Sequence, residues 1–372
     1  MKNYLGVLLI VLVYTIHSSA QQKVFYIGHS LVNFEMPRMV QRLSENASAA
    51  MIYNLQITNG ASIRANFLNP GSAQGDRYDN FLNNGSFNKL IVTEAVPLTN
   101  HITWSECHLY ADKFYVYASN YKPDITMYIY ETWHCLYTGT ADGCPYDPDD
   151  ADLWRARLTR DLPKWEGIMN AVNGKHSLKN VKLIPAGQAM AALYDKIMEG
   201  KVPGITSINQ IFADDIHPND VGNYFVACVM YSVIHGKSPV GLTNQLYGQY
   251  NNAYKAPTVA QAKIFQETAW ETICKYPFDG VECTPIITAN DEAENSTITI
   301  YPNPVNHEFH IKGLENKENL FLMDITGRKV FEKKLSGQAT ESINAENFPS
   351  GIYSLILQEG KKLSITKISI ME

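Results

Sequence analysis

Short apolar segments without polar alternation recur between residues 24 and 184, and stretches of helical character separate them. A strand that is apolar throughout must be covered on both faces, which is typical of parallel sheets flanked by helices. The apolar segments are 24–27, 90–93, 125–130 and 181–184, with a further strand expected at 53–58, and the helical stretches are 36–50, 106–120, 153–172 and 186–198. This alternation predicts an α/β fold that binds ligands at the carboxyl ends of its strands.

The length and charge of the chain exclude several classes of protein. At 372 residues the chain is long enough for one large and one small domain. Hydrophobic residues make up 45% and charged residues 18%, which argues against a disordered chain. Lys and Arg number 31 against 37 Asp and Glu, and no basic block stands out, so nucleic acid is not an expected partner.

The first twenty residues are typical of a signal peptide. Lys2 precedes an apolar run from Tyr4 to Ile16, and small residues at 18–20 (S-S-A) form a cleavage site. This run of 13 residues is too short to span a bilayer, and an uncleaved anchor would need a longer one. We therefore expect residues 1–20 to be removed, export to the periplasm, and no membrane span in the mature chain.

The six cysteines are expected to form disulfides if the chain reaches an oxidising compartment. Two pairs bracket short loops and are the simplest choice among about 15 connectivities. They are Cys135 with Cys144, and Cys274 with Cys283, while Cys107 and Cys228 either pair with each other or stay buried as free thiols. No C-x-x-C or C-x-x-H spacing occurs, so a metal site is not expected.

The composition of the chain changes near residue 284. All five Trp and all six Cys lie before it, and a polar, acidic stretch follows at 288–296. Six short alternating segments then predict a small antiparallel sandwich, at 297–301, 308–312, 320–324, 329–333, 351–357 and 363–370. The expected organisation is a signal peptide (1–20), an α/β domain (21–285), a linker (286–297) and an all-β domain (298–372).

The first apolar strand leads into residues 28–31 (G-H-S-L), which place Ser30 just after a glycine turn. A serine there can expose its hydroxyl and offer its backbone N–H to an anion. The alternative is a serine that only caps the following helix.

A carboxylate and a histidine lie three residues apart in 214–218 (D-D-I-H-P), ahead of a helical stretch at 219–231. If Asp214 accepts a hydrogen bond from one ring nitrogen of His217, the other nitrogen is free to take a proton from a serine. The alternative is an acidic turn with an exposed histidine. Because both motifs belong to one α/β region, we predict that Ser30, His217 and Asp214 form a catalytic site.

These motifs resemble those of the SGNH (GDSL-like) hydrolases over about residues 21 to 240. Residues 28–31 are similar to the first block of that family, 214–218 to its last block, and 58–60 (T-N-G) to the block that carries an oxyanion glycine. The resemblance implies a flavodoxin-like three-layer fold, a Ser-His-Asp site and ester hydrolysis, commonly deacetylation of carbohydrates in secreted members. The expected oxyanion donors are the N–H groups of Ser30 and Gly60.

One block departs from that family. Its members usually have Gly-x-Asn-Asp after the third strand, where this chain has 94–97 (E-A-V-P), with Asn100 further on. An ionised Glu94 cannot donate a hydrogen bond, whereas Asn100 can if its loop folds back. Losing one oxyanion donor can lower the rate ~100- to 1,000-fold. Asn100 is therefore the candidate third donor, and Glu94 a candidate substrate-binding residue.

Residues 131–134 (E-T-W-H) end another strand close to the same edge. The indole of Trp133 is a candidate platform for a sugar, and His134 a candidate partner for substrate hydroxyls. The alternative is that both side chains pack around the adjacent Cys135 loop, and a substrate role for Glu131 is less expected still.

The last part of the chain resembles the C-terminal sorting domain of type IX (Por) secretion in Bacteroidetes. The matching blocks, in order, are 301–304 (Y-P-N-P), 324–328 (D-I-T-G-R), 349–353 (P-S-G-I-Y) and 367–370 (K-I-S-I). The resemblance implies contact with that secretion machinery, passage across the outer membrane, and release or surface attachment. A carbohydrate-binding module is the alternative.

The sequence thus predicts a secreted, cofactor-free serine esterase that deacetylates a carbohydrate through an acyl-enzyme. Because the base must be neutral, activity should rise through about pH 6 to 7. The alternatives are a glycan-binding surface protein on an esterase-like scaffold, and a lipase or thioesterase.

Overall fold

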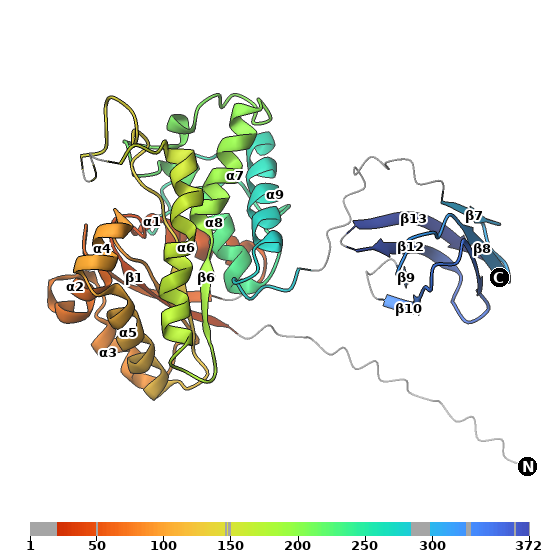
Figure 1. Cartoon of the computed structure of the whole chain (residues 1–372), viewed down its shortest axis with the longest axis horizontal. Helices are drawn as coiled ribbons and strands as arrows, with labels where there is room; N and C mark the ends of the chain where they lie inside the picture. The colour runs from red at the N-terminus through yellow and green to blue at the C-terminus, as the bar shows by residue number, and fades with distance from the viewer. Residues whose placement is uncertain are drawn as a thin grey trace, which may run out of the picture. The chain divides into compact units, whose positions relative to one another are not determined.

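The computed structural model describes residues 21–49, 51–145, 147, 150–283, 298–324, 329–360 and 362–371. The expected signal peptide and linker lie outside the described residues, as does 325–328 of one sorting-domain motif. The chain divides into two compact units, one ending at Cys283 and the other starting at Thr284 (Figure 1).

A six-stranded sheet forms the centre of the first unit, in the order β3-β2-β1-β4-β5-β6. Its strands are β1 (Gln22–Gly28), β2 (Met51–Ile57), β3 (Gln74–Gly75), β4 (Lys89–Val92), β5 (Thr126–Tyr130) and β6 (Val181–Ile184). Every pair is parallel except β2 with β3. Without the short β3, this is the flavodoxin-like strand order, whose switch point lies between β1 and β4. The predicted α/β fold with a parallel sheet is confirmed.

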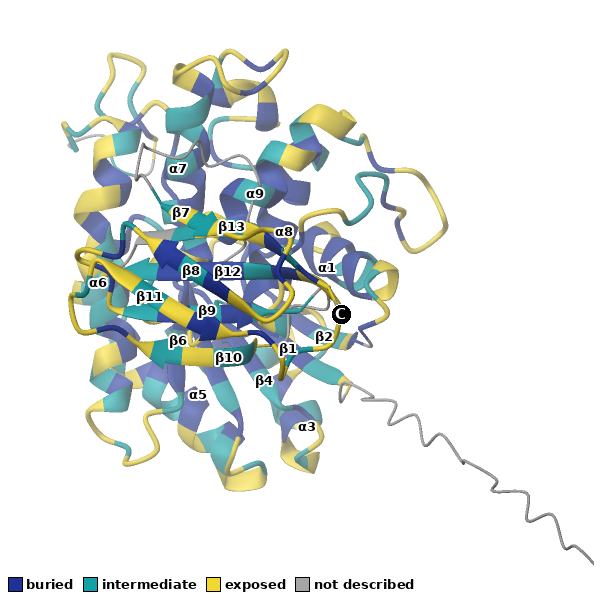
Figure 2. Cartoon of the chain, turned by 90° about the vertical axis from the view of Figure 1, so that its right-hand side faces the viewer, coloured by how far each residue is buried: buried dark blue, intermediate teal, exposed yellow. Residues whose placement is uncertain are grey.

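Helices cover both faces of this sheet. They are α1 (Glu35–Asn46), α2 (Ile63–Leu68), α3 (Tyr78–Phe81), α4 (Leu98–Trp104), α5 (Cys107–Tyr121), α6 (Trp154–Asn173), α7 (Ala186–Met198), α8 (Asp220–His235) and α9 (Val259–Lys275). Val24 and Tyr26 of β1 join the core that α1, α7, α8 and α9 cover, and Phe25 and Ile27 join the core under α5. Alternate side chains therefore enter opposite cores, which is why the strand is apolar throughout. Figure 2 shows the buried residues along α8 and α9.

The edge strand β6 is covered by the segment that follows α9. The N–H of Leu183 donates to the carbonyl of Phe278 at 3.0 Å. The disulfide between Cys274 and Cys283 holds both ends of this segment, as predicted. Pairing of this kind removes open hydrogen-bonding groups from the edge of a sheet.

The second unit is all-β, as predicted. One sheet has the order β10-β9-β12-β13 and the other β11-β8-β7. The strands are β7 (Thr299–Tyr301), β8 (Glu308–Lys312), β9 (Asn319–Met323), β10 (Lys329–Lys334), β11 (Thr340–Asn344), β12 (Gly351–Glu359) and β13 (Lys362–Ile370). All strand pairs are antiparallel, and a separate apolar core lies within the unit.

Candidate active site

Ser30 lies two residues beyond the end of β1, beside the switch point of the sheet. The turn before it requires glycine at position 28. A Cβ added to Gly28 would lie 2.5 Å from Val32 Cγ2 and 2.7 Å from Thr93 Cγ2. The close approach of β1 and β4 at their carboxyl ends therefore brings the serine turn against the turn that follows β4.

The structure brings the three predicted catalytic residues together. His217 Nε2 lies 2.8 Å from Ser30 Oγ, and His217 Nδ1 lies 2.8 Å from Asp214 Oδ2. The other carboxylate oxygen of Asp214 accepts hydrogen bonds from the backbone N–H groups of Ile216 at 2.9 Å and His217 at 2.7 Å. The three-residue spacing thus forms a compact turn in which Asp214 binds both the backbone and the ring of His217.

The electrostatics of the turn define the tautomer of His217. Partial burial opposes ionisation of Asp214, but the hydrogen bonds from His217 and Ile216 outweigh it and lower the pKa of this carboxyl. An ionised Asp214 accepts a hydrogen bond from Nδ1–H, so Nε2 is left to accept a hydrogen bond from the hydroxyl of Ser30. The side chains of His217 and Asp214 are 38% and 52% exposed, so the pair is open to a substrate.

The loop of Gly60 lies next to the serine turn. Gly28 of β1 pairs with Ile57 of β2, and the N–H of Thr58 donates to the carbonyl of Gly28 at 3.0 Å. Gly60 is exposed and has a φ of 68°, a left-handed conformation that favours glycine. Within the described residues, the N–H groups of Ser30 and Gly60 donate to no other group. Both are therefore available to an anion.

Glu94 is not on the substrate surface where the sequence placed it. Its side chain is fully buried and accepts hydrogen bonds from the N–H groups of Ile63, at 3.2 and 3.3 Å, and Ala95, at 2.7 Å. Burial raises the pKa of Glu94 to about 8. Because Ile63 begins α2 three residues after Gly60, Glu94 supports the Gly60 loop from beneath instead of contacting a substrate.

Asn100 does not join the site. It is exposed on α4, and no contact described in the structure links it to Ser30, Gly60 or His217. Residues 98–104 form the helix α4 and not a loop, and the role of Asn100 as a third oxyanion donor stays a prediction.

Trp133 and His134 are buried, so the predicted sugar contacts are wrong for both. Trp133 has no exposed surface, and its indole N–H donates to the carbonyl of Ile216 at 2.8 Å. His134 Nε2 lies 2.9 Å from Asp161 Oδ2, and burial lowers the pKa of this histidine. After β5 the chain turns inward and packs against the Cys135–Cys144 disulfide, which is itself as predicted.

His29 is a site residue that sequence reasoning missed. Its Nε2–H donates to the carbonyl of Glu94 at 2.9 Å, and its Nδ1 accepts from the N–H of Leu31 at 3.3 Å. Burial lowers the pKa of His29 to about 4, so the ring is neutral at pH 7. It therefore braces the turn on both sides of Ser30. The sequence signal that could have identified His29 is its position directly before Ser30.

Three further observations concern metal sites, free thiols and membrane spans. No group of His, Cys, Asp and Glu side chains suited to a metal ion occurs among the described residues. Cys107 and Cys228 are buried free thiols. Among helices of the described ranges, none is long and apolar enough to cross a membrane.

Several solved structures are similar to the chain. A DUF4886 family protein from Bacteroides uniformis is 16% identical, over 68% of this chain and 95% of its own, with a TM-score of 0.47. A carbohydrate esterase family 3 protein from Talaromyces cellulolyticus is 12% identical, over 59% of this chain and 100% of its own, with a TM-score of 0.36. A GDSL-like lipase from Bacteroides thetaiotaomicron is 12% identical, over 57% of this chain and 86% of its own, with a TM-score of 0.33.

A search of the curated proteins finds no match to this chain. Residues 299–371 match the family model of the secretion system C-terminal sorting domain. This segment spans the strands of the second unit, from β7 to β13. The second unit is thus a sorting domain of type IX secretion, and the protein is secreted or attached to the cell surface.

Proposed function

We propose that the first unit is a serine esterase of the SGNH type. One observation carries the proposal: Ser30 Oγ lies 2.8 Å from Nε2 of His217, whose Nδ1 lies 2.8 Å from Asp214 Oδ2. A serine hydroxyl is a weak nucleophile until a neighbouring base removes its proton. A histidine held in the correct tautomer by a carboxylate supplies that base.

In the proposed reaction, Ser30 Oγ attacks the carbonyl carbon of the ester while its proton passes to His217 Nε2. The oxyanion that forms receives hydrogen bonds from the N–H groups of Ser30 and Gly60. The C–O bond to the alcohol then breaks, and the alcohol takes the proton from His217. Water attacks the acyl-serine next and gives a proton to His217. The bond between the acyl carbon and Ser30 Oγ then breaks, Oγ takes that proton back from His217, and the acid is released.

For the substrate we propose an acylated carbohydrate, with acetate as the acyl group. The half-exposed Asp214 and His217 suit an ester carried on a bulky chain, because no deep burial of the substrate is needed to reach Ser30. The sorting domain places the enzyme outside the cell, where polysaccharides are encountered. Release of acetate from acetylated xylan, pectin, alginate and sialoglycans identifies the substrate.

A second candidate is a glycan-binding surface protein on the same scaffold. The absence of a described contact between Asn100 and Ser30 favours it, because only two backbone donors then face the oxyanion. Such a protein would bind glycans without turning over esters.

Hydrolysis of p-nitrophenyl acetate separates the two candidates. The proposal expects Ser30→Ala to lose the enzymatic turnover and Ser177→Ala to keep it. Ser177 is exposed and precedes the amino end of β6, whereas Ser30 follows the carboxyl end of β1. If the wild type and Ser30→Ala hydrolyse the ester equally and both bind glycans, the protein is a glycan-binding protein and not an esterase.

A further inference from the structure

We propose that Trp133 is a positioning residue for the proposed esterase reaction: its indole N–H, carried on the segment 131–144 just before the Cys135–Cys144 disulfide, holds the turn 214–217 in place against Ser30. The inference rests on the proposed function. It concerns a side chain that contacts no substrate and acts only through His217.

The turn 214–217 is held from inside and from outside. Within the turn, the Asp214 carboxylate accepts hydrogen bonds from the N–H groups of Ile216 and His217. From outside, the indole N–H of Trp133 donates to the carbonyl of Ile216 at 2.8 Å, and the N–H of Leu136 donates to the carbonyl of Asp215 at 2.6 Å. The loop 131–144 therefore binds both carbonyls that lie between the predicted carboxylate and base.

Trp133 also contacts the segment that leads into this turn. Its ring packs edge-on against Phe212, with 6.1 Å between the ring centroids. Phe212 forms a β-bridge with Pro218, which closes the chain on both sides of the turn. The turn itself is half-exposed at His217 and Asp214, whereas Trp133 has no exposed surface. A buried side chain thus contacts the half-exposed turn through one hydrogen bond to Ile216 and reaches the segment before it through one ring contact with Phe212.

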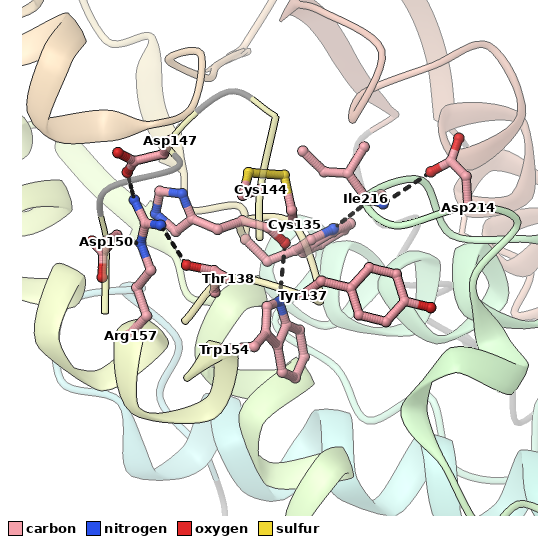
Figure 3. The surroundings of a disulfide bond; sticks show 12 residues. Cys135, Tyr137, Thr138, Cys144, Asp147, Asp150, Trp154, Arg157, Asp214 and Ile216 are labelled. Atoms are coloured by element: carbon pink, nitrogen blue, oxygen red, sulfur yellow. Dashed lines mark hydrogen bonds and ion pairs between the residues drawn. A yellow bond between two sulfur atoms is a disulfide. The ribbon is translucent and has the colours of Figure 1, made fainter. Parts of the chain in front are cut away.

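The loop that carries Trp133 is itself fixed to α6. The Cys135–Cys144 disulfide closes the part that follows Trp133, and the indole N–H of Trp154 donates to the carbonyl of His134 at 3.0 Å. Behind it, the fully buried Arg157 donates to Thr138 Oγ1 at 2.8 Å and pairs with Asp147. In Figure 3 the Cys135–Cys144 disulfide lies in the middle of the view, with Arg157 to its left and with Ile216 and Asp214 to its right.

Removing the indole N–H leaves the carbonyl of Ile216 without this partner and frees the turn to shift. Catalysis is sensitive to such shifts, since a misplacement of about 1 Å can lower the rate ~100-fold. A shift of His217 affects proton transfer but not the groups that bind the substrate. The expected effect is therefore a fall in kcat with little change in KM.

The test compares Trp133→Phe with Trp270→Phe in the full chain. Phenylalanine keeps an aromatic ring against Phe212 but has no N–H. Trp270 on α9 is also buried, and its indole nitrogen has no partner among the described residues, so the same substitution there removes no hydrogen bond. Thermal unfolding of Trp270→Phe measures the effect of a smaller ring by itself, and that of Trp133→Phe measures it together with the lost hydrogen bond.

Three readouts are taken: kcat and KM on p-nitrophenyl acetate, the rate at which a fluorophosphonate labels Ser30, and hydrogen exchange of the Ile216 and His217 amides. For Trp133→Phe we expect kcat and labelling to fall about 10- to 100-fold, KM to stay within about twofold, and both amides to exchange faster. Trp270→Phe should leave kcat and both amides unchanged.

If the wild type is active, and the two variants have equal kcat and equal exchange rates of the Ile216 and His217 amides, the inference is wrong. The proposed esterase function is then unaffected. A wild type without Ser30-dependent turnover or labelling overturns the proposed function, and the inference with it. Amide exchange also detects the anchoring of the turn without relying on activity, so a variant that loses turnover by global unfolding is recognised by fast exchange throughout.

Discussion

Asn33 Nδ2 donates a hydrogen bond to Asn223 Oδ1 at 3.0 Å and so joins segments 190 positions apart. Asn33 lies three residues after Ser30. Asn223 lies near the start of α8, and its own Nδ2 donates to the carbonyl of Pro218, directly after His217, at 3.2 Å. The side-chain bridge therefore connects the loop of the nucleophile to the loop of the base.

Asn223→Ala should lower kcat/KM on p-nitrophenyl acetate by about tenfold or more, because the distance between Ser30 and His217 is no longer braced. Asn223 is 7% exposed, so loss of its amide should also lower the free energy of unfolding by about 1 to 3 kcal/mol. Asn170→Ala, at an exposed position of α6, is the control and should change neither value. Equal kcat/KM in the two variants would contradict the bridging role.

Asp214→Asn should lower kcat by about 1,000- to 10,000-fold, as expected when the group that holds the histidine tautomer loses its charge. An amide can donate to Nδ1, which favours the tautomer in which Nε2 carries the proton and cannot accept one from Ser30. Steady-state kinetics at pH 7 and 8 measure the effect. A variant with activity near that of the wild type would show that Asp214 does not orient the base.

Gly60→Ala tests the second oxyanion donor. A Cβ at Gly60 meets nothing within 4 Å, so the substitution causes no clash and acts through its φ of 68°. The strain should cost about 1 kcal/mol of stability, and the reoriented N–H should lower kcat about 10- to 100-fold. Gly200, with a φ of 70° and the same open surroundings, is the matched control. Gly200→Ala should lose similar stability but no activity, and equal losses of activity would remove Gly60 from the mechanism.

Glu131→Gln should make the protein less sensitive to alkaline pH. Burial raises the pKa of Glu131 from 4.5 to about 8, against the opposing hydrogen bonds from Gln188. The carboxyl stays protonated in the folded chain but ionises in the unfolded chain, so unfolding releases a proton between these two pH values. The stability of the wild type should therefore fall as pH rises from 4.5 to 8, by about 1.4 kcal/mol for each unit of pKa shift at most.

Urea unfolding at pH 5 and pH 8.5 measures this difference. Glu131→Gln should lose less stability than the wild type between the two pH values. Glu94→Gln should behave in the same way, since burial also raises its pKa to about 8. Identical pH slopes in all three proteins would show that neither carboxyl is protonated in the native state.

Deleting residues 299–371 should keep the protein inside the outer membrane, because this segment is the sorting domain. Cell fractionation and immunoblotting measure its location. The full-length Ser30→Ala variant should be exported like the wild type, since sorting does not require the active site. Export of the shortened chain would contradict this.

Strong local patterns predicted much of the first unit. The helix expected at 186–198 matches α7, and the apolar strand at 181–184 matches β6. The elements α2, α3 and β3 were not predicted, because each has six residues or fewer and is stabilised by the rest of the fold. In the sorting domain, β11 was missed since its sequence (T-E-S-I-N) is largely polar and exposed.

In the candidate site, two short motifs were enough to predict that Ser30, Asp214 and His217 lie in contact, while their catalytic roles stay a prediction. Sequence reasoning failed where the role of a residue depends on a distant partner. Trp133 contacts Ile216, 83 positions away, and nothing in the local sequence reveals that contact. Glu94 follows a strand end, but its burial beneath Ile63 arises only from the folded loop.

Each unit has apolar cores of its own. The two cores of the first unit draw on residues up to Cys283, and the core of the second begins at Ile298. No residue belongs both to a core of the first unit and to the core of the second. The described hydrogen bonds of Ser30 and His217 are likewise all made within the first unit, so the proposed chemistry draws on that unit alone.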